Sequence, residues 1–300
     1  IYGNKLTTVP TLDEFFTGKA TDNRGNEYFT RKIAPFQPIY TAGYIQDKFA
    51  IEDLIFNVGL RIDRYDANQK VLKDKYLLYP AYTVDTDLSA SDVISTTDHP
   101  SNIGGDYVVY VDDVANPSTI VGYRNGDDWY DSGGRKISDP TLLSEAAGGS
   151  IAPYLGPTVA ADAINNNISA DAAFEDYTPE IIFMPRIAFS FPISDEAQFF
   201  AHYDVLTQRP PGYNRLDPVG YLFLANDVGA TLNNPDLKPE RTIDYELGFA
   251  KTLSLKSALK ISAFYKELRD MITKINVISA YPQQYYTFGN LDFGTVKGCQ

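Results

Sequence analysis

Residues able to do catalytic chemistry are few and scattered along this chain of 300 residues. The chain has two histidines, His99 and His202, and one cysteine, Cys299. A zinc site needs clustered Cys and His ligands, and neither a G-x-S-x-G nucleophile motif nor a phosphate-binding P-loop is present. The 39 carboxylates include many pairs, but no spacing singles out one pair for glycoside hydrolysis. We therefore expect a protein that is not an enzyme and that needs no cofactor.

An Asp- and Gly-rich run between residues 125 and 134 is the best candidate for binding chemistry. Its aspartates could supply oxygen ligands to Ca²⁺, although the spacing and the closing Glu of an EF-hand are absent. Turn-forming Asp and Gly explain the same residues without a metal, so both interpretations stay open. The only tryptophan lies in this run, and two tyrosines precede it. The candidate ligand-binding residues are Tyr107, Tyr110, Asp127, Asp128, Trp129 and Asp131.

Acidity is concentrated in one segment. Residues 68–180 contain 18 Asp and Glu against six Lys and Arg, a net charge of −12, whereas the whole chain carries −13. One interpretation is a solvated surface that resists aggregation. The other is a vestibule that attracts cations, cationic ligands or a basic partner. In either case the negative charge argues against a nucleic acid as the ligand.

Five runs of about 10 residues alternate apolar and polar side chains with the two-residue period of a strand. A tilted strand needs about 10 residues to cross a bilayer, whereas strands of soluble proteins usually have about 5 or 6. This length favours a membrane protein, with a large soluble β-protein as the alternative, because its strands also favour aromatic residues. The apolar positions run in steps of two over 54–62, 187–191, 199–205, 243–249 and 259–265.

The connections between these runs alternate strictly in length. Short connections fall at 51–53, 193–196 and 254–256, and long ones at about 67–180, 207–241 and 269–290. A transmembrane β-barrel has short turns on the periplasmic side and long loops outside, whereas both ends of a soluble sandwich face the same solvent. No apolar run of about 18 residues predicts a membrane helix. We therefore predict an all-β, antiparallel, multi-pass barrel of the outer membrane, with its long loops extracellular.

The second face of each strand would then point into a polar lumen. These side chains could line a ligand path, or they could simply form a polar, hydrogen-bonded wall. The candidate lumen-facing residues are Arg61, Arg186, His202, Asp204, Asp244 and Glu246, with Lys260 and Lys266 beside them.

The segment Asn234–Phe249, NPDLKPERTIDYELGF, resembles the N-P-x-L-K-P-E…Y-E-L-G strand entry of TonB-dependent outer-membrane receptors. Tyr44–Phe49 and Leu54–Arg61 resemble the Y-x-Q-D-x-W…L-x-x-N-x-G-x-R hairpin of that family. Residues 199–211 and 288–298 are similar to later barrel strands, so the resemblance covers 39–66 and 181–298, about half of the chain. The long loop around 106–131 resembles Oar-like receptors of Bacteroidetes. Gly298-Cys299-Gln300 departs from the G-F/V-E that the family usually has at this place.

The resemblance implies a 22-stranded barrel with an N-terminal plug and import driven by TonB. About seven strands, the last near 291–300, would lie in this chain, together with neither plug nor TonB box, so we interpret it as an internal piece of a longer protein. The expected organisation is an extracellular lead-in over 1–38, a barrel hairpin over 39–66, and further barrel strands over 181–300. Between the hairpin and these strands, 67–180 would form the long acidic extracellular loop with its own β-hairpin, joining 107–111 to 119–123.

Two function classes follow. The first is an importer that captures a ligand with its outer loops. Its partners would be the TonB system, membrane lipid and lipopolysaccharide, and a surface lipoprotein or another outer-membrane subunit. The second is a non-importing barrel that serves as a scaffold, an adhesin or a partner subunit, and a plug with a TonB box would argue against it. A soluble binding module or hydrolase is a third interpretation. Aromatic loops suit sugars or peptides, and the acidic segment disfavours anionic chelates.

Overall fold

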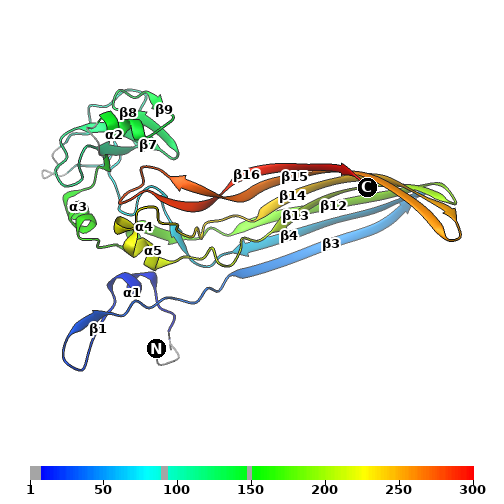
Figure 1. Ribbon diagram of the computed structural model, residues 1–300, viewed down its shortest axis with the longest axis horizontal. Coiled ribbons are helices and arrows are strands. Elements are labelled where there is room, and N and C mark those ends of the chain that lie inside the picture. The colour runs from blue at the N-terminus through cyan, green and yellow to red at the C-terminus, as the bar shows by residue number, and fades with distance from the viewer. Residues whose placement is uncertain (1–7, 89–93, 147–150) are drawn as a thin grey trace.

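The computed structural model describes residues 8–88, 94–146 and 151–300, and a seven-stranded antiparallel sheet dominates it. The strands lie side by side in the order β16-β15-β14-β13-β12-β4-β3, along the long axis of the molecule (Figure 1). This architecture confirms the predicted all-β antiparallel class. No helix within the described residues is long and apolar enough to cross a membrane. The strands are β3 (Ile39–Ile51), β4 (Leu54–Asp66), β12 (Glu180–Ser194), β13 (Ala197–Gln208), β14 (Glu240–Ser254), β15 (Ser257–Val277) and β16 (Tyr285–Cys299).

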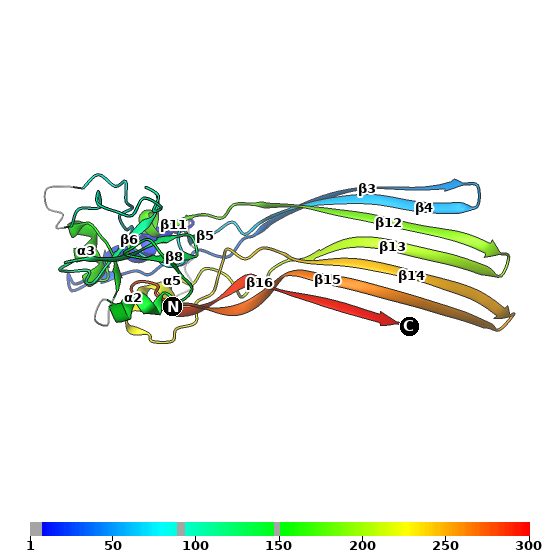
Figure 2. The ribbon, with the colours of Figure 1, turned by 90° about the horizontal axis from the view of Figure 1, so that it is seen from above.

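The two ends of the sheet differ. Two-residue turns at 52–53, 195–196 and 255–256 join β3 to β4, β12 to β13 and β14 to β15. All three turns lie at one end, while the long connections gather at the other (Figure 2). The alternation of short and long connections is therefore present in the structure.

The third long connection is shorter than predicted. β15 continues to Val277 and β16 begins at Tyr285, so the connection is 278–284, and the prediction of a loop over 269–290 is wrong. The pairing of the two strands shifts register between Leu268 and Ile272, where Asp270 has a φ of 56°. The residues at this irregularity resemble those of a turn, but β15 and β16 pair again beyond it. The last strand accordingly begins earlier than residue 291.

The long acidic connection folds into a module of its own, which we call the loop module (residues 70–176). β6 and β7 pair as an antiparallel hairpin inside a five-stranded sheet of order β10-β6-β7-β8-β9. β5 and β11 close the base of the module by pairing with each other. Two short helices, at 157–164 and 170–173, follow the five-stranded sheet in the chain. The elements are β5 (Lys70–Leu72), β6 (Val108–Val111), β7 (Ile120–Asn125), β8 (Asp128–Asp131), β9 (Lys136–Ile137), α2 (Thr141–Ala146), β10 (Ala152–Pro153), α3 (Pro157–Ile164), α4 (Ala170–Ala173) and β11 (Phe174–Asp176).

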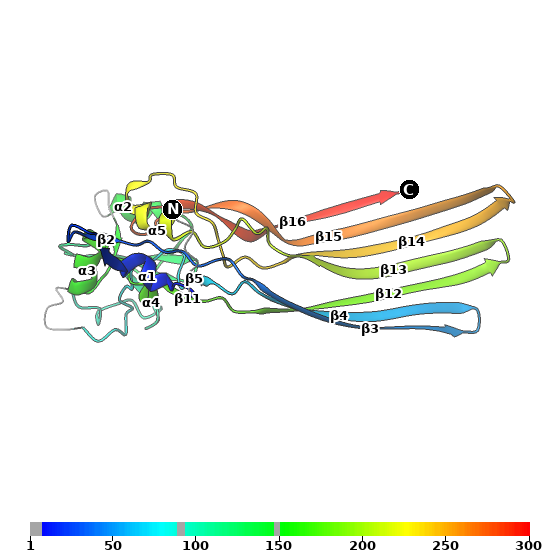
Figure 3. The same cartoon turned by 90° about the horizontal axis from the view of Figure 1, so that it is seen from below.

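A shared apolar core joins the loop module to the neighbouring connections. Phe15 of α1 (Leu12–Thr17), Phe174 of β11 and Tyr221 of α5 (Pro218–Phe223) are all buried in it. Figure 3 shows α1, α4 and α5 gathered at the loop end of the sheet. Because residues more than 200 positions apart bury one another, the loop end is a packed body and not a set of separate loops. The remaining elements here are β1 (Lys19–Thr21), β2 (Glu27–Phe29) and a 3₁₀ turn, η1 (Leu224–Asn226).

Candidate functional site

One face of the large sheet carries a row of paired charges. Arg186 on β12, Asp204 on β13 and Asp244 on β14 are direct cross-strand neighbours, and Lys266 on β15 completes the row. Arg186 Nε lies 2.9 Å from Asp204 Oδ1, and Lys266 Nζ lies 2.7 Å from Asp244 Oδ2. Opposite charges stabilise the pairing at each end of the row, and the two cations offset the repulsion between Asp204 and Asp244, which face each other in its middle.

A second group lies one step nearer the tight turns. His202 Nε2 is 3.7 Å from Glu246 Oε2, and Lys260 Nζ is 3.9 Å from the other oxygen of that carboxylate. The Lys260 ammonium also lies 4.8 Å from the centre of the Phe200 ring. The register therefore brings Arg186, His202, Asp204, Asp244 and Glu246 together on one face.

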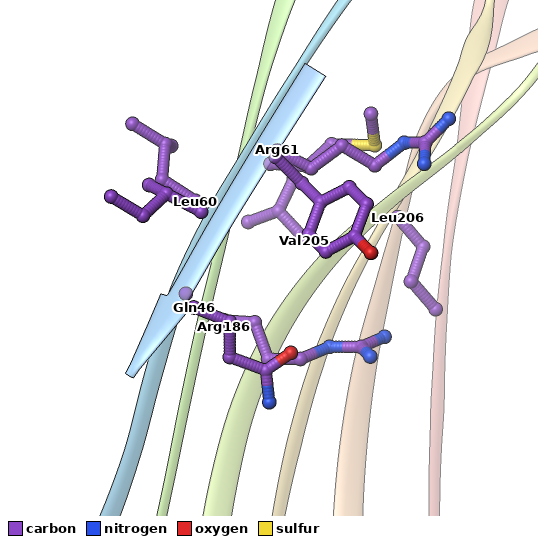
Figure 4. Close-up of a pocket in the computed structure, with 10 residues that line it drawn as sticks. Gln46, Leu60, Arg61, Arg186, Val205 and Leu206 are labelled. Carbon is purple, nitrogen blue, oxygen red and sulfur yellow. The ribbon is translucent and has the colours of Figure 1, made fainter. Parts of the chain in front are cut away.

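Arg61 stands on the same face, on the β3–β4 side of the sheet. Its Nε lies 2.8 Å from Asp63 Oδ1, and a terminal nitrogen donates to the Tyr40 hydroxyl at 3.1 Å. Tyr40 in turn donates to the Asp63 carboxylate. A hollow of about 330 Å³ lies beside this group. Figure 4 shows Arg61 and Arg186 on one side of the sheet at this hollow and Leu60 on the other.

The opposite face is apolar and aromatic. Phe49, Phe56, Phe189 and Phe199 form a continuous row across β3, β4, β12 and β13, with ring centres 5.3, 6.2 and 5.8 Å apart. A second row joins Tyr203, Tyr245 and Tyr265, with ring centres 5.1 and 6.1 Å apart. Several members of this face lie open to the surroundings, among them Phe183 at 59% exposure and Leu247 at 54%.

The six candidate residues of the loop module do not converge on one point. Tyr110 and Trp129 are buried, with ring centres 4.8 Å apart, in a core that includes Leu143. Burial raises the pKa of Tyr110 to about 12, although Arg124 partly offsets it. The Tyr110 and Trp129 rings therefore belong to the core that stabilises the module. Tyr107 lies nearer the surface, with its ring centre 5.3 Å from that of Tyr130.

The three candidate aspartates, Asp127, Asp128 and Asp131, have separate partners. Asp127 accepts from Tyr76 at 2.9 Å and lies 2.6 Å from Lys75 Nζ. Burial raises the pKa of Asp127, but these two hydrogen bonds outweigh it, and the pKa falls below its ordinary value. Asp128 pairs with Lys136 at 2.8 Å, and Asp131 with Arg135 at 3.0 Å. Across the described ranges, no group of three or more His, Cys, Asp or Glu side chains is placed to hold a metal ion.

Arg124 is a key residue that the sequence analysis missed. Its guanidinium is buried, pairs with Asp74, and donates to the Tyr110 hydroxyl at 3.1 Å and to the Gly126 carbonyl at 2.9 Å. It also lies 4.6 Å from the centre of the Tyr76 ring. The only signal in the sequence is one basic residue directly after the run Ile120–Tyr123, and nothing there links it to Asp74, 50 positions away.

Long antiparallel strands with one polar and one aromatic face, tight turns at one end and folded loops at the other, are typical of the wall of an outer-membrane β-barrel. The chain belongs to the family described as "TonB dependent receptor-like, beta-barrel", whose model matches residues 2–298. Membership confirms the resemblance found in the sequence, and the family is one of receptors and not of enzymes. The narrower likeness to Oar-like receptors of Bacteroidetes stays a prediction.

Solved structures similar to the chain are also receptors and transporters. The Serratia marcescens hemophore receptor HasR, in complex with HasA and heme, is 14% identical, and the match covers 94% of this chain and 34% of HasR, with a TM-score of 0.43. The FrpB iron transporter of Neisseria meningitidis is 12% identical, and the match covers 87% of this chain and 22% of FrpB, with a TM-score of 0.38. The ferric-catecholate import receptor Fiu of E. coli is 13% identical, and the match covers 87% of this chain and 24% of Fiu, with a TM-score of 0.38. The chain thus spans about a third or less of their length. The search of curated proteins returned no match.

Proposed function

We propose that this chain forms part of the barrel wall and of the extracellular loops of a TonB-dependent importer in the outer membrane. A ligand is captured at the loop end and passes along the polar face of the sheet, driven by the TonB system. The observation that carries the proposal is the two-sided asymmetry of the sheet. One face is aromatic and the other charged, and one end has tight turns while the other has folded loops.

The length of the apolar face fits a bilayer. On β12, every second residue from Ile181 to Phe191 is apolar, which is ten residue steps. At about 3.3 Å per residue and a tilt of about 40°, these steps cover about 25 Å along the membrane normal. The apolar band of outer-membrane barrels has about this height. The Phe and Tyr rows would then contact lipid.

Lipopolysaccharide is a further proposed partner at the loop end of the same face. Arg241 on β14 faces Arg269 on β15 in direct register, two positions beyond Ile243. Like charges on facing strands repel each other unless an anion lies between them. Arg269 also pairs with Glu267 at 2.6 Å. An anionic headgroup bound between the two guanidinium groups would relieve the repulsion.

The polar face suits a guide and not a tight binding site. Its charges already pair across the strands, so a passing ligand finds compensated partners rather than an open charge. We assign Arg61, Arg186, His202, Asp204, Asp244 and Glu246 to this wall. In the loop module, we assign capture to Tyr107, Asp127, Asp128 and Asp131, which lie nearer the surface and would exchange their present partners for the ligand, while Tyr110 and Trp129 support them. The domain boundaries expected from the sequence, the plug and a surface lipoprotein belong to this proposal.

The test is TonB-dependent depletion of ligands from a defined medium. Cells that produce the full-length protein are given a mixture of peptides, glycans and metal chelates, and mass spectrometry measures what disappears from the medium. We expect some compounds to be depleted only in the strain with a functional TonB. Equal depletion with and without TonB, or none, would contradict import and would favour a scaffold or adhesin.

A further inference from the structure

The loop end contains a pocket of about 770 Å³ that belongs to none of the groups described above. We call it the loop pocket. Its lining residues come from α1, the segment before β3, the start of β5 and the segment before α5, which are far apart in the sequence. Its volume falls within the range of about 300–1,000 Å³ that is usual for sites of small ligands.

Hydrogen bonds between its walls hold the pocket open. Gln69 accepts from the backbone nitrogen of Leu216 at 2.9 Å, and Asn68 donates to the Gln37 carbonyl at 2.9 Å. Arg31 donates to the carbonyls of Phe15 and Phe16 at 2.8 and 3.0 Å. Because each wall is tied to another part of the chain, the pocket is preformed and a ligand need not order it.

About half of the lining residues are apolar, and aromatic residues lie at the mouth. Phe15 and Leu216 belong to the inner wall, and Phe36 lies partly buried at the side. Ile33 and Tyr213 are exposed by 50% and 69%. An apolar interior with aromatic edges and a few polar groups is the usual form of a site for small organic molecules.

Three basic and two acidic side chains line the pocket, so its lining carries a net charge of +1. Lys70 is paired with Asp176 at 3.0 Å, and Asp217 accepts from the backbone nitrogen of Val219 at 3.1 Å. Lys32 and Arg215 have no carboxylate within 4.0 Å among the residues that the structure describes. Two cations without an ion-pair partner therefore line the pocket, against one carboxylate, Asp217, that also lacks a cationic partner among the described residues.

A third cation continues the site towards the polar face. A hollow of about 380 Å³ shares Phe36 and Gly212 with the loop pocket and includes Arg209. The Arg209 guanidinium lies 4.8 Å from the centre of the Tyr40 ring. Tyr40 is hydrogen-bonded to Arg61 and Asp63. The smaller hollow therefore connects the loop pocket to the charged face of the sheet.

We propose that the loop pocket binds a small anion with an aromatic or apolar body, held by Lys32 and Arg215 with its ring against Phe36 and Tyr213. The proposal rests on the importer function and names its ligand class. It reverses the expectation that the acidic segment disfavours anions. A bound anion would interact most strongly with the nearby side chains of Lys32 and Arg215. The negative charge of the loop module is more distant, and salt screens its repulsion.

The test is equilibrium dialysis of the full-length protein in nanodiscs against charged naphthalene probes, with empty nanodiscs subtracted. 2-Naphthoate is the anionic probe, 2-naphthylmethanol the neutral one and 2-naphthylmethylammonium the cationic one. We expect 2-naphthoate to bind most tightly. The double variant Lys32→Gln/Arg215→Gln should weaken its binding by about tenfold or more, because charge-assisted hydrogen bonds are lost.

Matched variants separate charge from packing. Phe36→Ala should weaken the anionic and the neutral probe alike, Arg215→Lys should retain most of the affinity for 2-naphthoate, and Lys256→Gln, in a turn at the other end, should change nothing. Retained folding of each variant is checked by the heat-dependent gel mobility of the barrel. The proposal fails if the double variant binds 2-naphthoate like the unaltered protein, or if the cation binds as well as the anion.

Failure of the importer function would look different. Dialysis needs no energy source and no TonB. Tight binding without TonB-dependent depletion would therefore contradict the importer function while supporting the anion site in the loop pocket. Conversely, TonB-dependent depletion with no probe binding would remove the pocket and leave import.

Discussion

At the scale of single residues, Arg124 shows how this protein orders an acidic segment. The segment carries a net charge of −12, yet one of its few cations is buried and uses every side of its guanidinium. It joins Asp74, at the base of the loop module, to the sheet that contains Tyr110 and Trp129. A planar group with several donors can make all these contacts at once, which a lysine cannot.

Replacing Arg124 should therefore loosen the loop module selectively. Arg124→Met leaves the Tyr110 hydroxyl without its donor and Asp74 without its partner, and we expect a loss of about 2–3 kcal/mol in the local stability of residues 70–176. Arg124→Lys should recover only part of it. Hydrogen exchange of the backbone amides of β6 and β7 measures the change.

The matched control is Arg135→Met. Arg135 also pairs with an aspartate, Asp131, but its side chain is 82% exposed, and exposed ion pairs contribute little. Equal loss of protection in the two variants would show that Arg124 acts through net charge and not through its buried contacts.

At the scale of elements, each strand of the large sheet presents two different faces in alternation. Ile187 lies among Val58 and Tyr203 on the aromatic face, and the next residue, Ala188, lies beside His202 on the polar face. Because successive side chains point to opposite sides, we expect one of two adjacent residues to face lipid and the other to face the lumen.

This contrast predicts unequal costs for one substitution at two adjacent positions. Ile187→Arg puts a charge near the middle of the apolar band and should destabilise the barrel by about 2–4 kcal/mol. Ala188→Arg, towards the polar face, should cost much less. Equilibrium unfolding in urea with lipid vesicles measures both, and equal costs would contradict the assignment of the faces.

Much of this level could be predicted from the sequence, because alternation depends only on neighbours in the chain. Ile243, Tyr245 and Leu247 mark a strand wherever their partners lie. The β15–β16 hairpin was underestimated because Asp270 has the signature of a turn, and only the pairing beyond it shows that the strands resume. The burial of Tyr110 and Trp129, the Arg124–Asp74 pair and the loop pocket depend on contacts between distant segments, which periodicity does not encode.

At the scale of the whole molecule, the two ends of the sheet are chemically and structurally unlike. The turn end has three two-residue turns, whereas the loop end carries a packed core, the acidic loop module and the loop pocket. A barrel inserted in an outer membrane must place one of these ends on the cell surface. The proposed function requires that end to be the loop end.

Site-specific labelling of intact cells tests this orientation. Asn116→Cys places a thiol in the exposed connection between β6 and β7, and Lys256→Cys places one in the turn between β14 and β15. The native thiol of Cys299 is exposed, so both variants are made with Cys299→Ser. A maleimide coupled to a long polyethylene glycol is too large to cross the outer membrane. We expect it to label Cys at 116 in intact cells, and Cys at 256 only after the outer membrane is permeabilised, because short barrel turns face the periplasm.

Purified protein in detergent, where both thiols should react, controls for reactivity. Labelling at 256 but not at 116 in intact cells would invert the barrel, and with it the capture of ligands by the loop module and the loop pocket.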